Sequence, residues 1–259
     1  MSDIVLQGRG ICTSFGSKRE RRQVLFDVDV DVYEGECLAI IGASGSGKST
    51  LTRVLFGLGS ADSGEITYRG QTMGKRGSAV RRMLRGQTGL VFQDPFASLD
   101  PRWRVARSVE EPLRLRHKGM GNDEIASQAE HALRVVGLDP AVFAARYPMD
   151  LSGGQAQRLA LARTLAHPRP VLILDDPFSA LDRKTEDTVF ANLQEYAKNK
   201  TVFLISHRLY HFPQMRQVIF MEDGKTAVGT HAELMASVPV YCQLYESQTG
   251  GTEHEDKAE

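Results

Sequence analysis

The sequence predicts an α/β protein with a mostly parallel sheet, an antiparallel β part at its N-terminus and a helical subdomain. Valines alternate with aspartates within residues 24–32, a period of two that marks a strand with one buried and one hydrated face. Five short apolar runs follow, and helical stretches separate most of them, which is typical of parallel strands covered on both faces. Residues 95–165 show no clear strand pattern, so we expect the helical subdomain there.

The antiparallel β part is expected to contain two strands, over residues 4–11 and 24–32. The aspartates at positions 27, 29 and 31 are potential metal ligands, but a hydrated strand face explains them without a metal. The core strands are expected at 36–41, 88–92, 171–175, 201–206 and 218–221.

One helix is predicted over residues 123–137, where Gly137 suits a helix C-terminus. Its apolar residues share one helical face and occupy positions 125, 129, 132, 133 and 136. A basic cluster occurs earlier, at Lys75, Arg76, Arg81, Arg82 and Arg85. Nucleic acid or lipid headgroups would suit these side chains, but a hydrated helix face fits the balanced charge of the whole chain better.

Composition narrows the functional classes. The 259 residues include 32 Lys+Arg and 32 Asp+Glu, which argues against a general nucleic-acid coat. No apolar run approaches the ~20 residues that cross a bilayer, and we expect no signal peptide. Three widely spaced cysteines fit neither a disulfide framework nor a zinc site and favour a reducing cytosol.

We expect one domain over residues 1–249 and a frayed polar tail over 250–259.

A glycine-rich loop joins the strand at 36–41 to a helix predicted over 51–58. The loop reads Gly42-Ala43-Ser44-Gly45-Ser46-Gly47-Lys48-Ser49-Thr50 and matches G-x-x-x-x-G-K-[ST]. Glycines let backbone N–H groups converge on phosphate oxygens, and the helix N-terminus adds partial positive charge. Lys48 would reach the β- and γ-phosphates of a nucleotide, and Ser49 would hold Mg²⁺. The strand–loop–helix context argues against the alternative, a glycine turn with an incidental lysine.

Two carboxylates, Asp175 and Asp176, stand at the end of the strand predicted over 171–175. A carboxylate in this place beside a phosphate loop suits Mg²⁺, directly or through water. Its neighbour suits the orientation or deprotonation of an attacking water. Two aspartates that open a turn at Pro177 are the structural alternative, which the phosphate loop on the same chain disfavours.

A second anion site is indicated at Leu151-Ser152-Gly153-Gly154-Gln155, which precedes an apolar helix. Ser152 suits the N-cap, and the two glycines expose backbone N–H groups at the helix start. A plain helix cap is the alternative, and it would be preferred if this motif stood alone.

Together, these motifs resemble those of the nucleotide-binding subunit of ATP-binding cassette (ABC) transporters. The resemblance covers about residues 4–246, with the motifs in the family's order and spacing. The motifs are the loop at 42–50, Gln93, residues 151–155, the acids at 175–176, the segment Ser179-Ala180-Leu181-Asp182 and His207. The resemblance implies a RecA-like P-loop core, ATP and Mg²⁺ as cofactors, and ATP hydrolysis coupled to transport.

The resemblance also assigns roles to single residues. Phe15 would stack on adenine, Gln93 would contact Mg²⁺ and sense the γ-phosphate, and His207 would hydrogen-bond the γ-phosphate and hold the attacking water. The residues expected in catalysis are therefore Lys48, Gln93, Asp176 and His207, and those expected at the metal are Ser49, Gln93 and Asp175. Ser152, Gly153, Gly154 and Gln155 would act on ATP bound by a second ATP-binding subunit, in a homodimer or a heterodimer.

Asp176 departs from the family pattern, which usually has glutamate here. Aspartate is one methylene shorter, so its carboxylate falls back by about 1.5 Å, one C–C bond length. Asp176 is then a weak base, part of the degenerate half of a heterodimer, or a base whose backbone has shifted to compensate. We expect impaired hydrolysis.

The resemblance further implies separate transmembrane subunits and a peripheral location on the cytoplasmic face of the membrane. The segment from Gln93 to Arg102 is similar to peptide and nickel importers, whereas segments after residue 205 are more similar to exporter cassettes. A free-standing cassette that begins near its first strand favours an importer. A non-transport ATPase of DNA repair or translation is the alternative, but one cassette without a long insert or zinc spacing disfavours it. No nucleic-acid partner is expected, and the transported substrate would be selected by other subunits.

Overall fold

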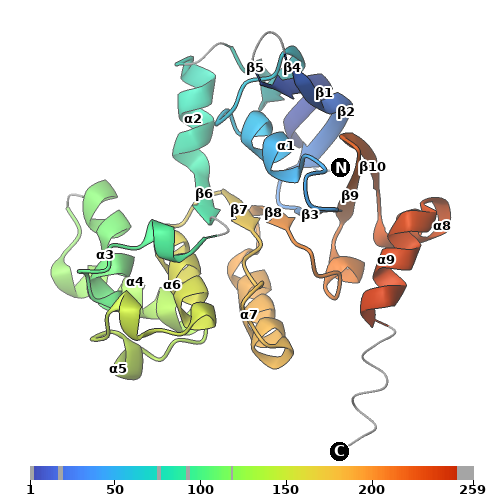
Figure 1. Ribbon diagram of the computed structural model, residues 1–259. Coiled ribbons are helices and arrows are strands. Elements are labelled where there is room, and N and C mark those ends of the chain that lie inside the picture. Colours follow the sequence, from blue (N-terminus) through green and yellow to red (C-terminus); the bar gives the residue numbers. More distant parts are fainter. Residues whose placement is uncertain (1–2, 17–19, 75–76, 92–93, 118, 250–259) are drawn as a thin grey trace, which may run out of the picture. The chain divides into compact units, whose positions relative to one another are not determined.

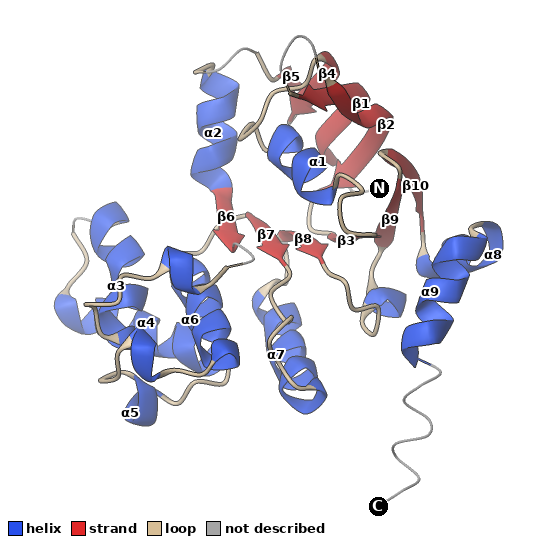
Figure 2. Cartoon of the chain, viewed as in Figure 1, coloured by secondary structure: helices blue, strands red, loops and turns tan. Residues whose placement is uncertain are grey.

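The structure is a computed structural model that describes residues 3–16, 20–74, 77–91, 94–117 and 119–249 (Figure 1). Its contacts group into two compact units. The first unit combines residues 1–87 with residues 201–259, and the second consists of residues 88–200. Both units contain strands and helices (Figure 2). No helix among the described residues is both long enough and apolar enough to cross a membrane.

The first unit contains the antiparallel β part that the sequence predicts. Its strands lie in the order β2-β1-β4-β5, and β1 is antiparallel to both β2 and β4. Their bounds are β1 Ile4–Phe15, β2 Arg22–Tyr33, β4 Ser63–Tyr68 and β5 Gln71–Thr72.

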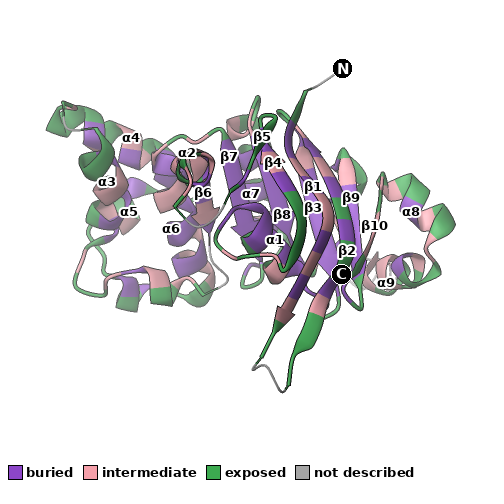
Figure 3. Ribbon diagram, turned by 90° about the horizontal axis from the view of Figure 1, so that it is seen from above, coloured by how far each residue is buried: buried purple, intermediate pink, exposed green. Residues whose placement is uncertain are grey.

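The alternation in β2 has the predicted consequence. Val28, Val30 and Val32 are at most 2% exposed, whereas Asp29 is exposed. Figure 3 shows buried and exposed stretches along β1 and β2. Asp31 accepts hydrogen bonds from the Arg9 guanidinium, which lower the pKa of this carboxyl against the opposing effect of burial. Among the described residues, no group of three or more acids, histidines or cysteines could hold a metal. The buried valines and the exposed Asp27 and Asp29 confirm a strand with one hydrated face.

The core of the first unit is built around β3, which is parallel to β8 on one side and to β9 on the other. Leu38, Ala39 and Ile40 of β3 are completely buried. β10 is antiparallel to β9. The strands are β3 Cys37–Gly42, β8 Thr201–Ile205, β9 Gln217–Glu222 and β10 Lys225–Gly229. The helices are α1 Lys48–Leu55, α2 Ala79–Gln87, α8 His231–Ser237 and α9 Pro239–Thr249.

The second unit contains two parallel strands and the helical part of the fold. β6 (Thr88–Val91) pairs with β7 (Val171–Asp175). The helices are α3 Val105–Arg116, α4 Asn122–Val135, α5 Pro140–Phe143, α6 Gly153–Ala166 and α7 Arg183–Tyr196. Helices α3, α4 and α6 pack against one another and form the core of this unit.

Two helices test the local predictions. The five apolar positions expected on one face are all buried, although α4 ends at Val135, two residues earlier than predicted, and Val136 is its C-cap. Gly137 follows with φ +70°, as a C-terminal glycine does. Helix α1 begins three residues earlier than predicted, at Lys48, because Gly47 adopts φ +106° and serves as its N-cap. It ends before Gly57, whose φ of +68° is incompatible with a right-handed helix.

The basic cluster is not a uniformly hydrated helix face. Arg82 and Arg85 are exposed, but Arg81 is only 8% exposed. The Arg81 guanidinium donates to the backbone carbonyls of Gly74 (2.8 Å), Gly59 (3.0 Å) and Gly57 (3.3 Å). This residue therefore ties α2 to two loops. Lys75 and Arg76 lie outside the described residues.

We expect Arg81→Ala to lower the free energy of unfolding by about 2–3 kcal/mol, because three backbone carbonyls lose a donor and that of Gly57 is buried. Urea denaturation followed by circular dichroism measures this change. Arg82→Ala on the same helix is the matched control, and it should stay within about 0.5 kcal/mol of the unsubstituted chain. Equal midpoints for the two variants would show that Arg81 has no special structural role.

Candidate functional site

The predicted site residues are divided between the two units. Phe15, the glycine-rich loop at 42–50 and His207 belong to the first unit, and residues 151–155 with Asp175 and Asp176 belong to the second. Gln93 lies outside the described residues.

The glycine-rich loop owes its course to three of its glycines. Gly45 and Gly47 have φ of +81° and +106°, in the left-handed region that favours glycine. A Cβ at Gly42 would lie 2.1 Å from the carbonyl oxygen of Met221, and one at Gly45 would meet no atom within 4 Å. The loop therefore packs tightly at its start and is open at its tip.

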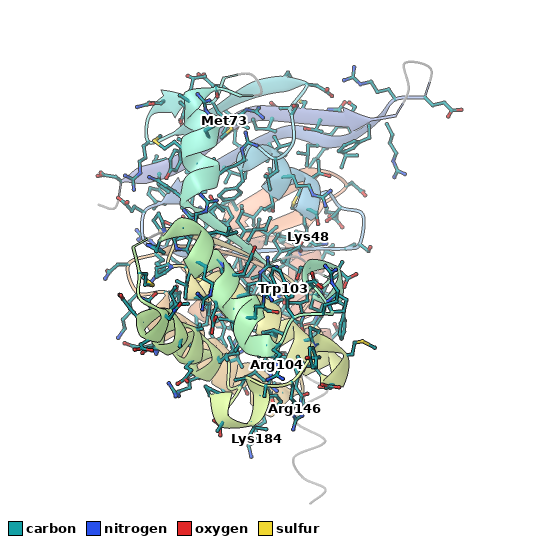
Figure 4. The ribbon with its side chains drawn as sticks, turned by 90° about the vertical axis from the view of Figure 1, so that its left-hand side faces the viewer. Lys48, Met73, Trp103, Arg104, Arg146 and Lys184 are labelled. Carbon is teal, nitrogen blue, oxygen red and sulfur yellow. The ribbon has the colours of Figure 1, made fainter. Side chains whose placement is uncertain are left out.

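Lys48 lies in the first turn of α1 and is only 7% exposed (Figure 4). Its Nζ donates to the carbonyl oxygens of Gly42 (2.7 Å) and Ala43 (2.8 Å), so the ammonium group is folded over the loop. The Ser46 hydroxyl is buried without a hydrogen-bond partner in the described structure, and Ser49 is exposed. The Lys48 ammonium, the Ser46 hydroxyl and the first backbone N–H groups of α1 are all groups that bind phosphate oxygens. The loop therefore fits a nucleotide phosphate chain.

The other two site residues of the first unit are accessible. Phe15 is 56% exposed at the end of β1, where it pairs in register with Arg22 of β2. His207 follows β8 and is exposed. Its backbone carbonyl accepts a hydrogen bond from Nε2 of Gln248 in α9, at 2.8 Å. Exposed faces suit both a ring that stacks on a base and an imidazole that binds an anion.

In the second unit, Asp175 ends β7 and Asp176 starts a turn with φ +51°. This left-handed conformation is uncommon outside glycine, and aspartate is among the residues that tolerate it. Asp176 is 5% exposed. Asp182 ends the following segment and caps α7, and hydrogen bonds from Thr185 lower the pKa of its carboxyl.

Gln157 of α6 holds this turn and was not anticipated from the sequence. Its Nε2 donates to the Asp176 carbonyl (2.6 Å) and to the Ser179 hydroxyl (2.8 Å), and its Oε1 accepts from the Ala180 N–H (2.9 Å). A Cβ at Gly154 would lie 2.7 Å from the Ala180 carbonyl oxygen, so only glycine fits there without movement. The start of α6 and the turn after Asp176 are therefore one connected piece.

Ser152 is the N-cap of α6. Its hydroxyl accepts from the Gln155 N–H (3.3 Å), and the Gln155 side chain accepts from the Ser152 N–H (3.0 Å), which is a capping box. The predicted helix cap at Ser152 is therefore confirmed. Ser152 and Gly153 are also exposed, so the helix start remains accessible to an anion.

Comparison with known proteins identifies the family. The sequence model of the family described as ABC transporter matches residues 25–179. The chain belongs to the ABC transporter family. Glutathione import ATP-binding protein GsiA of Salmonella paratyphi A is 42% identical over 185 residues, which are 69% of this chain and 29% of that protein. The chain thus spans less than a third of this curated relative.

Two solved structures share the fold of this ABC protein. The ATP-binding cassette MJ0796, a dimer in a post-hydrolysis state with ADP and Pi, has a TM-score of 0.79 and 29% identity, covering 87% of this chain and 98% of its own. A bacterial Atm1-family ABC exporter with ATP bound has a TM-score of 0.78 and 25% identity, covering 96% of this chain and 43% of its own. The predicted α/β fold class is confirmed, and the chain shares the fold of ATP-binding cassettes.

Proposed function

We propose that this cassette hydrolyses ATP to drive import through separate transmembrane subunits. The observation that carries the proposal is the loop geometry, in which a buried Lys48 ammonium lies 2.7 Å from the Gly42 carbonyl oxygen at the start of α1. The GsiA similarity supports import, since that protein is named as an import ATP-binding protein. The similarity to a cassette with ADP and Pi supports hydrolysis.

The proposed site residues are those that match the family's motifs. Residues 42–50 bind the ATP phosphates, Phe15 stacks on adenine, and Ser49, Gln93 and Asp175 hold Mg²⁺. Mg²⁺ usually keeps several waters and is bound through one or two carboxylates and the substrate phosphates, which fits a donor set with a single carboxylate, Asp175. Asp176, Gln93 and His207 act at the γ-phosphate and the attacking water, where positioning and charge provide most of the catalysis.

We further propose a partner and a location. Residues 152–155 bind ATP held by a second cassette, which the dimeric MJ0796 structures and the exposed start of α6 support. The cassette pair lies on the cytoplasmic face of the membrane, bound to the transmembrane subunits.

Transport direction tests this proposal. The assembled transporter would be placed in vesicles with the cassettes outside, and ATP would be added outside. An importer moves solute toward its cassettes, so a peptide such as glutathione loaded in the lumen should leave in an ATP-dependent manner. Accumulation of solute in the lumen would instead identify an exporter.

A specific observation favours a second candidate, an exporter cassette that forms one half of a heterodimer. Asp176 stands where the family usually has glutamate, which suits a degenerate site, and the Atm1-family exporter shares the fold at a TM-score of 0.78. Transport into the lumen, together with co-assembly of a different cassette carrying glutamate, would establish this alternative.

We expect Asp176→Glu to raise the single-turnover rate of hydrolysis by about tenfold, because misplacement of about 1 Å can cost on the order of a hundredfold. Asp176→Asn should lower the remaining rate at least tenfold, since it keeps the shape but removes the base. Asparagine also tolerates the left-handed backbone, so this variant is structurally conservative. Rapid-quench measurements in the assembled complex, with ATP affinity checked, report both rates. If the glutamate variant is no faster, the shorter side chain does not limit hydrolysis.

A further inference from the structure

The C-terminal helix α9 is joined to the loop that carries His207 by one side chain. Gln248 accepts a hydrogen bond from the Leu209 N–H at its Oε1 (3.0 Å) and donates from its Nε2 to the His207 carbonyl oxygen (2.8 Å). The two backbone groups differ in character, one a donor and one an acceptor, so they define the orientation of the amide. Figure 1 shows α9 beside the segment that follows β8.

The backbone around His207 is also held at the residue before it. The Ser206 N–H donates to the Ile40 carbonyl oxygen of β3 (3.2 Å), and the Arg208 N–H donates to the Ser206 hydroxyl (3.0 Å). The core strand therefore fixes the loop at Ser206, and Gln248 fixes it over the next three residues.

Helix α9 is itself anchored in the core of the first unit. Tyr241 in its first turn is completely buried and packs against Phe220 of β9, with ring centroids 5.9 Å apart. The Tyr241 hydroxyl also lies 2.7 Å from Nδ1 of His231. Gln248 therefore extends from a fixed helix, which is what a side chain needs if it is to hold a loop in place.

We propose that Gln248 is a positioning residue for His207. The amide holds the His207 carbonyl and the Leu209 N–H, and so holds the imidazole between them where it can meet the γ-phosphate. This inference rests on the proposed role of His207 in ATP hydrolysis. It makes the C-terminal helix part of the catalytic support, although Gln248 itself touches no substrate.

Steady-state ATPase kinetics of the full chain in its assembled complex test the proposal. Gln248→Ala should lower kcat about tenfold, because loss of support on the order of 1 Å can cost up to about a hundredfold. The KM for ATP should stay within about twofold, since the loop at 42–50 and Phe15 are untouched. Gln243→Ala is the matched control, because Gln243 is an exposed glutamine of the same helix, and this variant should keep the wild-type kcat.

A second variant separates positioning from general support of the fold. Gln248→Glu keeps the acceptor for the Leu209 N–H but opposes the His207 carbonyl with a carboxylate oxygen. Protonation restores a donor, so the kcat deficit relative to wild type should shrink as the pH falls from 8 toward the ordinary glutamate pKa of about 4.3. A deficit that is constant with pH, or a Gln248→Ala kcat within twofold of wild type, would overturn the proposal.

His207→Ala distinguishes failure of this inference from failure of the proposed function. If His207→Ala hydrolyses ATP at the wild-type rate, the proposed role of His207 is wrong. If His207→Ala is impaired while Gln248→Ala is not, only the positioning role of Gln248 is wrong.

Discussion

Lys48→Ala is expected to reduce ATP hydrolysis on the order of a thousandfold, the upper range for loss of one donor that stabilises developing charge. The Lys48 ammonium is folded over the loop at 42–50, where it would face several phosphate charges, and charge-assisted hydrogen bonds of this kind are strong. ATPase assays and fluorescent-nucleotide titration would measure the loss of turnover and of binding.

Two controls belong to this experiment. Lys225→Ala removes an exposed lysine from β10 and should leave both quantities unchanged. Lys48→Met keeps most of the buried aliphatic length, so it shows whether any loss follows from the charge or from packing. Hydrolysis by Lys48→Ala at near the wild-type rate would remove the basis for assigning residues 42–50 to phosphate binding.

Ser152→Arg is expected to abolish ATP-driven dimerisation. Without nucleotide the chain should be monomeric or weakly dimeric, because half of each proposed ATP site belongs to the partner. ATP should drive dimer formation when hydrolysis is blocked by Asp176→Asn. Arginine at Ser152 places a bulky cation at the start of α6, where the helix dipole and the proposed phosphate contact both favour an anion. Light scattering coupled to size exclusion would measure the mass with and without ATP.

The capping role of Ser152 needs its own control, because loss of an N-cap costs about 1 kcal/mol by itself. Thr230 caps α8 with the same kind of box, in which its hydroxyl accepts from the Glu233 N–H. Thr230→Arg therefore removes an equivalent cap elsewhere and should leave ATP-driven dimerisation intact. Unchanged dimerisation and hydrolysis in Ser152→Arg would contradict a shared site.

Features that depend on short stretches of sequence were predictable. The valine alternation in β2, the apolar face of α4 and the glycine-rich loop each follow from neighbouring residues, and each is present in the structure. The strands β4 and β10 were missed because few of their side chains are buried, which leaves little hydrophobic pattern to detect. The two-residue strand β5 is exposed and has no pattern at all.

Residues that support the site through distant backbone groups could not be predicted. Arg81 reads as one of several basic residues, and only the folded chain brings three glycine carbonyls to it. Gln157 and Gln248 contact backbone groups 19 and 41 residues away in sequence, at Asp176 and His207. An isolated glutamine carries no local signal of such a role.

The hydrogen bonds from Gln157 to the turn after Asp176 have a consequence for the hydrolysis of two ATP molecules in a dimer. Gln157 lies five residues beyond Ser152 in α6, or roughly 7.5 Å along the helix axis. The same rigid helix would therefore contact the partner's nucleotide at its tip and hold the backbone of its own Asp176 a little over one turn later. ATP bound at one site would then affect the position of Asp176 at the other site. The hydrolysis rate should therefore depend cooperatively on ATP concentration, with a Hill coefficient above one.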